Sequence, residues 1–504
     1  MRAKNQFRVK LIFPPYLEAV SIYNADTFAY LPFGMGVLAS FLRTHNYTVE
    51  QDDLSIKFNR HRSVLFSSLR HRCVSAVGGI TLLKDILPRL RAFLQSREGC
   101  EAIEPLVDKI LSATTVANFD LIGFSIFSDL QFHLALALSK KIKQVTRTPI
   151  VFGGAFINAH GHLYPEVFAI LDYMIIGDGR IPLVKLIEHL KAGTLVKDVP
   201  NLIYRKNDQM ILTPQERNRL EGMPIPDFSD LFLQKYQNRY FEASEKGVLL
   251  PYQISNRCAS SCAFCNSWKT QAGLEFKSHD KVVRELRQMR ELYKSRVFHF
   301  CDAMINNSYA YLEELCDCLI KNKLNILWKS YAKVNNLDAN ILEKMKKAGC
   351  YWLDFGIESG SDKMLIAMEK GFTSEQAGRT LRASSEAGII NNISLIAGYP
   401  HETLEDVKQT VEFLRKNRRA IHYRKVWKFE LKYNSFLYLS PDRYGIENLK
   451  QICRYTFSFD ETNGLVWSKK MKQREDSFRM IVRSSRRYMH LKNTWFSLRR
   501  YCGF

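Results

Sequence analysis

Strand-like apolar runs alternate with helical patterns in two separate series along this chain of 504 residues. In the first series the all-apolar run FDLIGFSIF is followed by DLQFHLALALSKKIKQV, where apolar residues recur at helical spacing. The pattern repeats as far as about residue 195, which predicts a doubly wound parallel sheet covered by helices. We therefore expect an α/β, Rossmann-like domain at residues 1–195.

A second series runs over residues 246–425, with strand–helix units of the size of a βα repeat. Such a series predicts a full or partial parallel barrel, in which the chemistry lies at the carboxyl ends of the strands. Residues 196–245 separate the two series and indicate a hairpin followed by a linker rich in Pro and Asp. We expect the remaining residues, 426–504, to form a basic, aromatic-rich and α-rich segment.

The composition limits where the protein acts and what it binds. The 73 Lys and Arg residues outnumber the 51 Asp and Glu residues, which fits either an acidic partner or plain solubility. We find no apolar run long enough to span a membrane, and the apolar run near the N-terminus is too short for a signal peptide. The 11 cysteines are scattered apart from one cluster, which predicts a reducing compartment and hence the cytoplasm. No nucleic-acid-binding motif is recognised, so we expect no nucleic-acid partner.

The stretch SNRCASSCAFCNSW places three cysteines on one predicted loop: Cys258, Cys262 and Cys265. A structural zinc ion usually takes four N or S ligands, and the nearest histidine in the sequence is His279. Three thiolates also suit an iron–sulfur cluster, in which one iron would stay open to a substrate or cofactor. The small spacer residues allow the loop to fold around a cluster, and Phe264 is expected to shield it from water. A zinc site with three thiolates is the less common alternative.

This CxxxCxxC pattern after a first barrel strand resembles that of the radical SAM superfamily. The resemblance implies a partial (β/α)6 barrel, a 4Fe–4S cluster on the three cysteines, and S-adenosylmethionine (SAM) bound to the open iron. One electron passed to SAM would give a 5′-deoxyadenosyl radical, and a flavodoxin or ferredoxin would serve as the reductant. The cofactors would carry the chemistry, while the barrel positions them and excludes water.

Three further stretches resemble motifs of this superfamily. FGIESGSDKMLIAMEKGFT and ISLIAGYPHET are similar to its SAM-binding strand ends, and FHFCDAMIN stands where another of its motifs is usual. The resemblance implies a set of cofactor contacts: Phe264, Gly356, Glu358, Ser359, Ile396 and Gly398. It also implies catalytic roles for Asp302 and Glu358, in contacts to SAM or in proton handling. Cys301 departs from the pattern and is expected in the core or as a thiol close to the site.

The first 195 residues resemble the cobalamin-binding domain that precedes many radical SAM barrels. The matching stretches are LPFGMGVLASFLR, DLIGFSIFSDL, VFGGAF and YMIIGDGRIPLVKLIEHL. No D-x-H-x-x-G string occurs, and His133, His160 and His162 lie in other contexts, which implies a cobalt without a histidine from the protein. The remaining cobalamin contacts would come from small residues: Ser125, Ser128, Gly153, Gly154, Gly177 and Gly179. The alternative is a Rossmann-like domain that has lost its cofactor and serves as a scaffold.

These resemblances imply a cobalamin-dependent radical SAM methyltransferase. It would transfer a methyl group to an unactivated carbon of a natural product, peptide or cofactor-type substrate, and we expect it to act as a monomer. A cyclisation or rearrangement without methyl transfer is the first alternative, and a catalytically inactive scaffold is the second. The stretch VWKFELKYNSFLYLSPDRYGIE resembles a segment placed over the substrate entrance. The basic tail after Lys469 would either meet a phosphorylated substrate or peptide, or cap the barrel as a helix.

Overall fold

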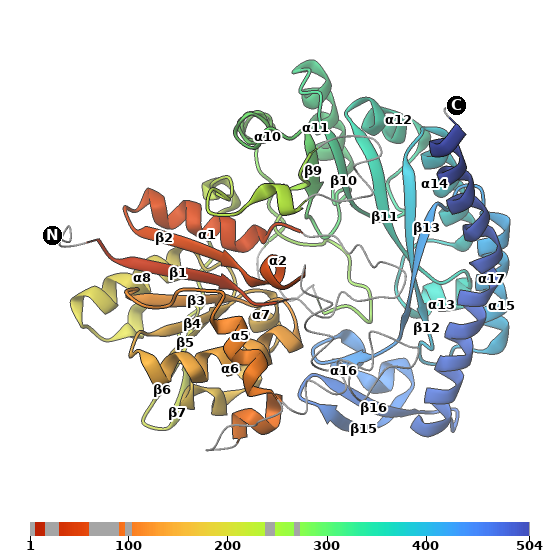
Figure 1. The fold of residues 1–504 in the computed structure, drawn as a ribbon. Coiled ribbons are helices and arrows are strands. Elements are labelled where there is room, and N and C mark those ends of the chain that lie inside the picture. The colour runs from red at the N-terminus through yellow and green to blue at the C-terminus, as the bar shows by residue number, and fades with distance from the viewer. Residues whose placement is uncertain are drawn as a thin grey trace. The chain divides into compact units, whose positions relative to one another are not determined.

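The computed structural model describes residues 6–15, 30–59, 90–95, 103–236, 247–266 and 273–502 (Figure 1). The chain divides into two compact units. The first comprises Met1–Pro251 with Leu292–Ser295, and the second comprises Tyr252–Glu291 with Arg296–Phe504. Within the described ranges, no helix is both long and apolar enough to cross a membrane.

The first unit is built on a seven-stranded sheet with the order β2-β1-β3-β4-β5-β6-β7. Its strands are β1 (Arg8–Phe13), β2 (Thr48–Asp53), β3 (Leu121–Ser125), β4 (Ile150–Gly153), β5 (Tyr173–Ile175), β6 (Leu202–Lys206) and β7 (Gln209–Leu212). The first five strands pair in parallel, which confirms the predicted doubly wound sheet. In this strand order the direction of winding reverses between β1 and β3, where ligands bind in folds of this kind.

The helices of the first unit follow its strands. They are α1 (Phe33–Thr44), α2 (Leu54–Asn59), α5 (Glu104–Leu111), α6 (Asp129–Val145), α7 (Ala155–His160) and α8 (Arg180–Ala192). Figure 1 shows α1 on one face of the sheet and α5 and α6 on the other. The sheet is buried between the two helical layers, and the apolar side chains of β3 and β4 are buried accordingly.

The predicted hairpin and linker are part of the first unit. β6 and β7 form the hairpin, and β6 pairs antiparallel with β5, so the hairpin extends the sheet. The linker that follows packs on the same unit: Phe228 and Tyr236 are fully buried, and the Tyr236 hydroxyl donates to Asp53 at 2.7 Å. Short 3-10 turns occur at Gly161–Leu163, Pro165–Ala169, Val196–Asp198, Leu220–Gly222 and Leu233–Tyr236.

The second unit is built on a six-stranded sheet whose strands follow one another in chain order, from β8 to β13. They are β8 (Leu250–Tyr252), β9 (Val297–Phe300), β10 (Leu327–Ala332), β11 (Cys350–Glu358), β12 (Ile390–Ala397) and β13 (Tyr423–Lys428). The pairs from β9 to β13 are all parallel. This arrangement confirms the predicted partial (β/α)6 barrel.

The helices of this barrel are α10 (His279–Tyr293), α11 (Tyr309–Lys321), α12 (Ala339–Lys347), α13 (Asp362–Ala367), α14 (Ser374–Glu386) and α15 (Leu404–Lys416). Five of them begin after a residue whose side chain accepts a hydrogen bond from the first turn: Ser308, Asp338, Ser361, Thr373 and Thr403. Such caps satisfy N–H groups that have no partner within the helix, so they fix where each helix starts. The loops between strand and helix are thereby held in place.

The C-terminal segment contains a small sheet in addition to the expected helix. β14 (Leu431–Lys432), β16 (Thr456–Glu461) and β15 (Ile446–Cys453) form an antiparallel sheet in that order, and α16 (Phe436–Leu439) and a 3-10 turn (Pro441–Tyr444) lie between β14 and β15. The long helix α17 (Trp467–Cys502) contacts α15, β12 and β13 (Figure 1).

Candidate active site at the carboxyl edge of the second sheet

The loop after β8 carries three half-buried thiols: Cys258, Cys262 and Cys265. The loop is anchored at Ala263, which is fully buried. The Ala263 N–H donates to the Met368 carbonyl at 3.1 Å, and the Ala263 carbonyl accepts from the Leu437 N–H at 3.2 Å. Phe264 is partly buried and packs against the core cluster that contains Ala263. Its predicted role in shielding a cluster from water stays a prediction.

Asp302 holds the first part of the cysteine loop. Its carboxylate is buried and accepts hydrogen bonds from the Ser255 N–H, from the Ser255 hydroxyl at 2.6 Å and from the Ile254 N–H at 3.2 Å. Burial raises the pKa of Asp302 to about 6, and the Ser255 hydrogen bonds act in the opposite direction. These contacts make Asp302 a positioning residue for the loop, while its predicted role toward SAM or protons stays a prediction.

Asn307 directly follows the stretch FHFCDAMIN and was not recognised from the sequence. Its side-chain nitrogen donates to the Arg257 carbonyl at 2.9 Å, and its side-chain oxygen accepts from the Ala259 N–H at 2.8 Å. These two bonds bracket Cys258. A single asparagine after a strand carries no distinguishing signal in a sequence, because its role depends on a partner about 50 residues away.

Two lysines contribute positive charge close to the thiols, and both were missed from the sequence. The Lys333 ammonium donates to the Ser260 hydroxyl at 3.0 Å. Lys370 is buried, and its ammonium lies 5.8 Å from the centre of the Phe264 ring. Burial raises the pKa of the Cys262 thiol, and the two ammonium groups act in the opposite direction. Positive charge of this kind favours the thiolate form that metal binding requires.

The donor set fits an iron–sulfur cluster. Within the described part of the chain, no three His, Cys, Asp or Glu side chains are grouped so that they could hold a single metal ion. The loop nevertheless supplies three thiols within eight residues, with two cations beside them, and a cluster of four irons spans more than one ion does. A 4Fe–4S cluster bound here would be held by Cys258, Cys262 and Cys265.

Glu358 ends β11 in a strained conformation. Its φ is +71°, which side chains other than glycine rarely adopt, and strain of this kind gathers at functional sites. The carboxylate is buried and lies 3.8 Å from the Lys370 ammonium. Burial raises the pKa of Glu358, and Lys370 acts in the opposite direction. A Cβ atom at Gly356 would lie 2.7 Å from this carboxylate, so the glycine makes room for Glu358 itself. Contacts of either residue to SAM stay predictions.

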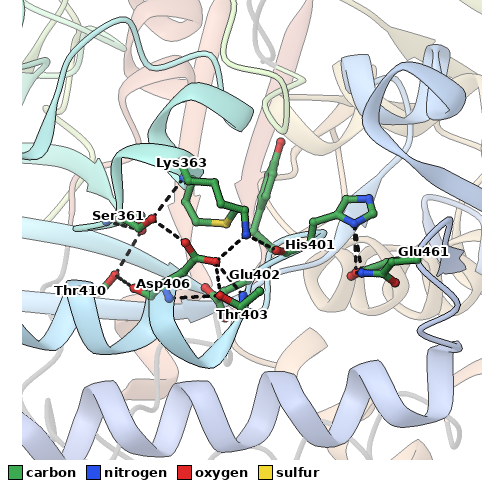
Figure 2. Close-up of polar contacts among 12 residues, drawn as sticks. Ser361, Lys363, His401, Glu402, Thr403, Asp406, Thr410 and Glu461 are labelled. Carbon is green, nitrogen blue, oxygen red and sulfur yellow. Dashed lines mark hydrogen bonds and ion pairs between the residues drawn. The ribbon is translucent and has the colours of Figure 1, made fainter.

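The loop after Glu358 is tied to the start of α15 through Asp406. Figure 2 shows Ser361, Lys363 and Thr403 directed toward the Asp406 carboxylate. It accepts from the Ser361 hydroxyl at 2.7 Å, the Lys363 ammonium at 2.8 Å and the Thr403 hydroxyl at 2.7 Å. The Ser359 hydroxyl lies 3.2 Å from the hydroxyl of Thr410, which is part of α15. The described contact of Ser359 is therefore structural, and its predicted contact to SAM is untested.

The end of β12 is covered by α17. Ile396 is buried, and the Gly398 N–H donates to the Glu402 carboxylate at 2.8 Å. Gly398 has a φ of +80°, and a Cβ atom there would lie 2.9 Å from the Cα of Arg474 in α17. The backbone and side chain of Arg474 therefore require a glycine here, whatever else approaches this position. The predicted contact of Ile396 and Gly398 with the adenine base stays a prediction.

Cys301 lies at the end of β9, where its N–H donates to the Tyr252 carbonyl at 2.7 Å. Its sulfur is 3.7 Å from Nδ1 of His299. Burial raises the pKa of Cys301 to about 12, so the thiol is protonated at neutral pH. The residue is thus a neutral thiol next to His299 and separate from the three cysteines of the loop.

The residues predicted to contact cobalamin lie at the carboxyl ends of β3, β4 and β5 and at the starts of the helices that follow. Ser125 ends β3, Gly153 ends β4, Gly177 follows β5, and Ser128, Gly154 and Gly179 directly precede α6, α7 and α8. The structure therefore gathers all six at one edge of the first sheet. The histidines that the sequence offers lie in helical segments: His133 in α6, His160 in α7 and His162 in a 3-10 turn.

Two of these residues already have roles within the protein. The Ser128 hydroxyl accepts from the Gln131 N–H at 3.4 Å and so caps α6. Gly154 has a φ of +101°, and a Cβ atom there would lie 2.7 Å from the Ile126 backbone nitrogen. Only glycine fits such a position without moving the backbone. Contacts of the six residues to cobalamin stay predictions.

Comparison with known proteins agrees with this arrangement of strands and loops. Residues 252–414 match the radical SAM superfamily. The chain is 25% identical over 302 residues to an uncharacterized methyltransferase of Pyrococcus horikoshii, which covers 59% of this chain and 64% of the relative. It is 24% identical over 321 residues to an anaerobic magnesium-protoporphyrin IX monomethyl ester cyclase of Rubrivivax gelatinosus, covering 61% and 56%. The matches therefore span less than two thirds of either relative.

Two solved structures share the fold over both units. One is the radical S-adenosylmethionine methyltransferase TsrM from Kitasatospora setae, solved with cobalamin and a 4Fe–4S cluster; it has a TM-score of 0.61 at 18% identity and covers 88% of this chain and 80% of TsrM. The other is the cobalamin-dependent enzyme OxsB with aqua-cobalamin, with a TM-score of 0.64 at 16% identity, covering 91% and 65%. The fold is that of cobalamin-dependent radical SAM enzymes. Residues 252–414 form a radical SAM domain.

Proposed function

We propose that this protein is an enzyme that cleaves SAM reductively, with a 4Fe–4S cluster held by Cys258, Cys262 and Cys265. The observation that carries the proposal is one loop with three thiols at the carboxyl edge of a parallel barrel, next to two lysines. The bound cluster would supply one electron to SAM, and a protein of the flavodoxin or ferredoxin type would deliver it. Glu358, buried and strained at the end of β11, would accept a hydrogen bond from the ammonium or hydroxyl groups of SAM.

The residues of the chain would do three things in this reaction. Asp302 and Asn307 fix the cysteine loop through backbone hydrogen bonds, so the thiols are positioned before a cluster is bound. Lys333 and Lys370 compensate the negative charge of three thiolates. The barrel wall excludes water from the radical, which would otherwise react with solvent groups.

We further propose that the first unit binds cobalamin and that the reaction is a methyl transfer to an unactivated carbon. Support comes from the carboxyl edge of its sheet, where the six small residues named above gather and where folds of this kind bind their ligands. TsrM and OxsB share the fold, and TsrM is a methyltransferase. Bound cobalamin would carry the methyl group, and the substrate would be a natural product, a peptide or a cofactor-type molecule.

A ring-forming reaction without methyl transfer is the second candidate. It is favoured by the similarity to the cyclase of Rubrivivax gelatinosus and to a second cyclase, from a Synechocystis strain, at 21% identity. The two candidates differ in one product. Methyl transfer consumes a second SAM molecule as methyl donor and leaves S-adenosylhomocysteine, whereas a cyclisation does not.

The cluster is tested by reconstitution with iron and sulfide under anaerobic conditions. We expect the absorbance of a 4Fe–4S cluster and, with dithionite and SAM, release of 5′-deoxyadenosine. Cys262→Ala should abolish both signals. Cys318→Ala, which removes a half-buried thiol of α11, is the matched control and should retain them. A cluster that survives Cys262→Ala at full iron content would refute the assignment of the three cysteines.

Cobalamin binding and the type of reaction are tested separately. Protein produced in cobalamin-fed cells should contain about one corrinoid per chain, and S-adenosylhomocysteine should accumulate together with 5′-deoxyadenosine. Corrinoid-free protein that still releases 5′-deoxyadenosine would leave the radical SAM proposal intact and overturn the cobalamin proposal. Release of 5′-deoxyadenosine without S-adenosylhomocysteine would favour the cyclisation.

A further inference from the structure

The loop that follows β11, residues 359–361, lies directly against the helix α15. A Cβ atom at Gly360 would lie 2.7 Å from the Cα of Thr410 and 2.5 Å from the Cβ of Phe413, so the loop touches the body of the helix. All three residues of the loop are buried. Figure 2 shows Thr410 on the side of α15 that faces Ser361. The conformation of this loop therefore depends on α15.

The Thr410 hydroxyl is the centre of the contact, and its residue is 3% exposed. It accepts from the Gly360 N–H at 3.0 Å, lies 3.2 Å from the Ser359 hydroxyl and donates to the Asp406 carbonyl at 3.0 Å. Because its single proton goes to that carbonyl, the Ser359 hydroxyl must donate to Thr410. The Ser359 hydroxyl accepts in turn from the Ser361 N–H at 3.1 Å. One arrangement of protons thus satisfies the whole chain of hydrogen bonds.

The Asp406 carboxylate holds the loop at a second point. It accepts from the Ser361 hydroxyl at 2.7 Å and from the Lys363 ammonium at 2.8 Å. The same ammonium donates to the His401 carbonyl at 3.0 Å. Burial acts to raise the pKa of Asp406, but hydrogen bonds led by that of Lys363 outweigh it and lower the pKa. The carboxylate is therefore ionised at neutral pH and only accepts, as its neighbours require.

The segment that leads into α15 also holds the second strand end predicted to contact SAM. The buried Glu402 carboxylate accepts from the Gly398 N–H at 2.8 Å, just beyond β12. His401, whose carbonyl accepts from Lys363, has a φ of +58°. It is the second residue other than glycine in the left-handed region at this edge, after Glu358 with a φ of +71°. The start of α15 thus contacts the loops that carry both strained residues.

The strain at Glu358 makes these contacts matter for the site. A residue keeps a strained conformation only where its surroundings fix it. The pairing of β11 with β12 shifts register between Gly356 and Glu358, so the strand ladder is interrupted immediately before the strained residue. On the other side of Glu358 the chain continues into Ser359 and Gly360, which are held by Thr410. The helix therefore supplies constraint that the ladder lacks at this point.

We propose that Thr410 and Asp406 are positioning residues of the SAM site, which hold Glu358 in the conformation in which its carboxylate accepts hydrogen bonds from SAM. The inference rests on the proposed function, because it takes Glu358 as a contact of SAM. It adds that the affinity for SAM depends on two residues of a helix outside the predicted contacts. The cysteine loop is fixed by other residues, so binding of the cluster does not depend on Thr410.

The first test measures the loop itself by hydrogen exchange and mass spectrometry on the reconstituted protein. Thr410→Val keeps the shape of the side chain but leaves the Gly360 N–H without its acceptor, so we expect faster exchange in residues 356–364. Thr410→Ser returns the hydroxyl and should restore slow exchange. Ser384→Ala is the matched control, because it removes a buried hydroxyl that donates to Asn391 at 2.7 Å at the amino end of β12. It should leave exchange in residues 356–364 unchanged.

The second test measures the affinity for SAM by equilibrium dialysis of labelled SAM. The cluster is kept oxidised, so no electron is available and no SAM is cleaved. Thr410→Val should weaken binding about tenfold, as loss of a buried hydrogen bond predicts. Thr410→Ser should recover most of the affinity, and Ser384→Ala should bind as the unchanged protein does. Iron content should be the same in all of them.

A comparison of kcat with KM separates positioning from general loss of stability. With dithionite and saturating SAM, Thr410→Val should release 5′-deoxyadenosine at close to the rate of the unchanged protein, while its KM for SAM rises. A helix that only stabilises the fold would give a smaller amount of active protein with an unchanged KM. Ser384→Ala should show that second behaviour if it has any effect.

Asp406→Asn tests the second contact. The amide keeps the size of the side chain but replaces one acceptor oxygen by a donor and removes the charge that pairs with Lys363. We expect a loss of affinity for SAM of about tenfold here as well. Glu412→Gln, whose side chain is 57% exposed on the same helix, is the matched control and should bind SAM as the unchanged protein does.

The inference is wrong if Thr410→Val and Asp406→Asn bind SAM as tightly as their controls, or if exchange in residues 356–364 is the same in Thr410→Val as in Ser384→Ala. Either result, with normal binding of SAM by the unchanged protein, leaves the radical SAM function intact. If the unchanged protein has its cluster but binds no SAM, the proposed function is wrong and the inference fails with it. The two failures are therefore told apart by the unchanged protein alone.

Discussion

The two units place candidate sites at the same kind of edge, the carboxyl ends of parallel strands, but they equip these edges differently. The second unit uses reactive and charged side chains, such as Cys262, Glu358 and Lys370, and fixes them with hydrogen bonds from neighbouring loops. The first unit presents glycine and serine, exemplified by Gly154 and Ser128, which serve the turns and helix starts themselves. The residue types at the second site therefore indicate a chemistry, whereas those at the first site indicate only the shape of the edge.

Each unit also buries a lysine beside a carboxylate, and replacing this lysine gives the largest predicted effect. In the second unit the Lys470 ammonium lies 2.7 Å from the Glu461 carboxylate, with both side chains 1% exposed. In the first unit Lys10 is fully buried 2.9 Å from Asp52, whose side chain is 11% exposed and also accepts from Thr114 at 2.6 Å. Asp52 therefore keeps other partners when Lys10 is lost, and Glu461 keeps weaker ones.

Lys470→Met should reduce the free energy of unfolding of the second unit by about 3–5 kcal/mol, because it leaves a buried carboxylate without its cation. Lys10→Met should cost the first unit less. Hydrogen exchange measured by mass spectrometry reports on the two units separately. The double variant Lys470→Met/Glu461→Leu should recover part of the loss, since it removes the unpaired charge. Equal losses in the two units, or no recovery in the double variant, would contradict this account.

Much of the fold and part of the site follow from the sequence, because they depend on local patterns. Strand–helix alternation predicts both parallel sheets, and the spacing of Cys258, Cys262 and Cys265 identifies the loop. The residues that support this loop were not predicted. Asn307 and Lys370 act on partners far away in the sequence, and an asparagine or lysine by itself does not indicate such a partner.

The inner face of the barrel and the role of two glycines were also beyond the sequence. Periodicity shows that alternate residues of β10 differ in environment, but which set faces the helices depends on packing. Gly356 and Gly398 are predicted to contact SAM, which stays a prediction, and the structure adds that the Glu358 carboxylate and Arg474 occupy the space that a side chain would need. A glycine indicates close approach without indicating what approaches.

Glycine substitutions compare the two edges directly and should give the next largest effect. Gly154→Ala combines a φ of +101° with a Cβ atom 2.7 Å from the Ile126 backbone, so we expect a loss of about 3 kcal/mol or more. Gly193→Ala, at a φ of +65° with open space around it, should cost about 1 kcal/mol and is the matched control. Urea unfolding of each variant measures the difference. Similar losses for the two variants would show that the backbone near Ile126 moves freely.

A buried aspartate in each unit provides the smallest effect, which is a dependence of stability on pH. Burial raises the pKa of Asp53 in the first unit to about 6, and the hydrogen bond from Tyr236 acts in the opposite direction. Burial raises the pKa of Asp302 in the second unit to about 6 as well. For both residues, the folded chain therefore holds its proton at pH values where the unfolded chain, with an ordinary aspartate, has already lost it.

The sign follows from proton binding. Between about pH 4 and pH 6 the unfolded chain binds fewer protons than the folded chain, so the free energy of unfolding falls as the pH rises through this window and levels off above it. A shift of roughly two pKa units corresponds to about 2–3 kcal/mol for each residue. Asp53→Asn should remove this slope from the first unit alone, and Asp302→Asn from the second alone. Hydrogen exchange at pH 4.5 and pH 7, each compared with the unchanged protein at the same pH, measures both; a slope that survives in the substituted unit would assign it to another group.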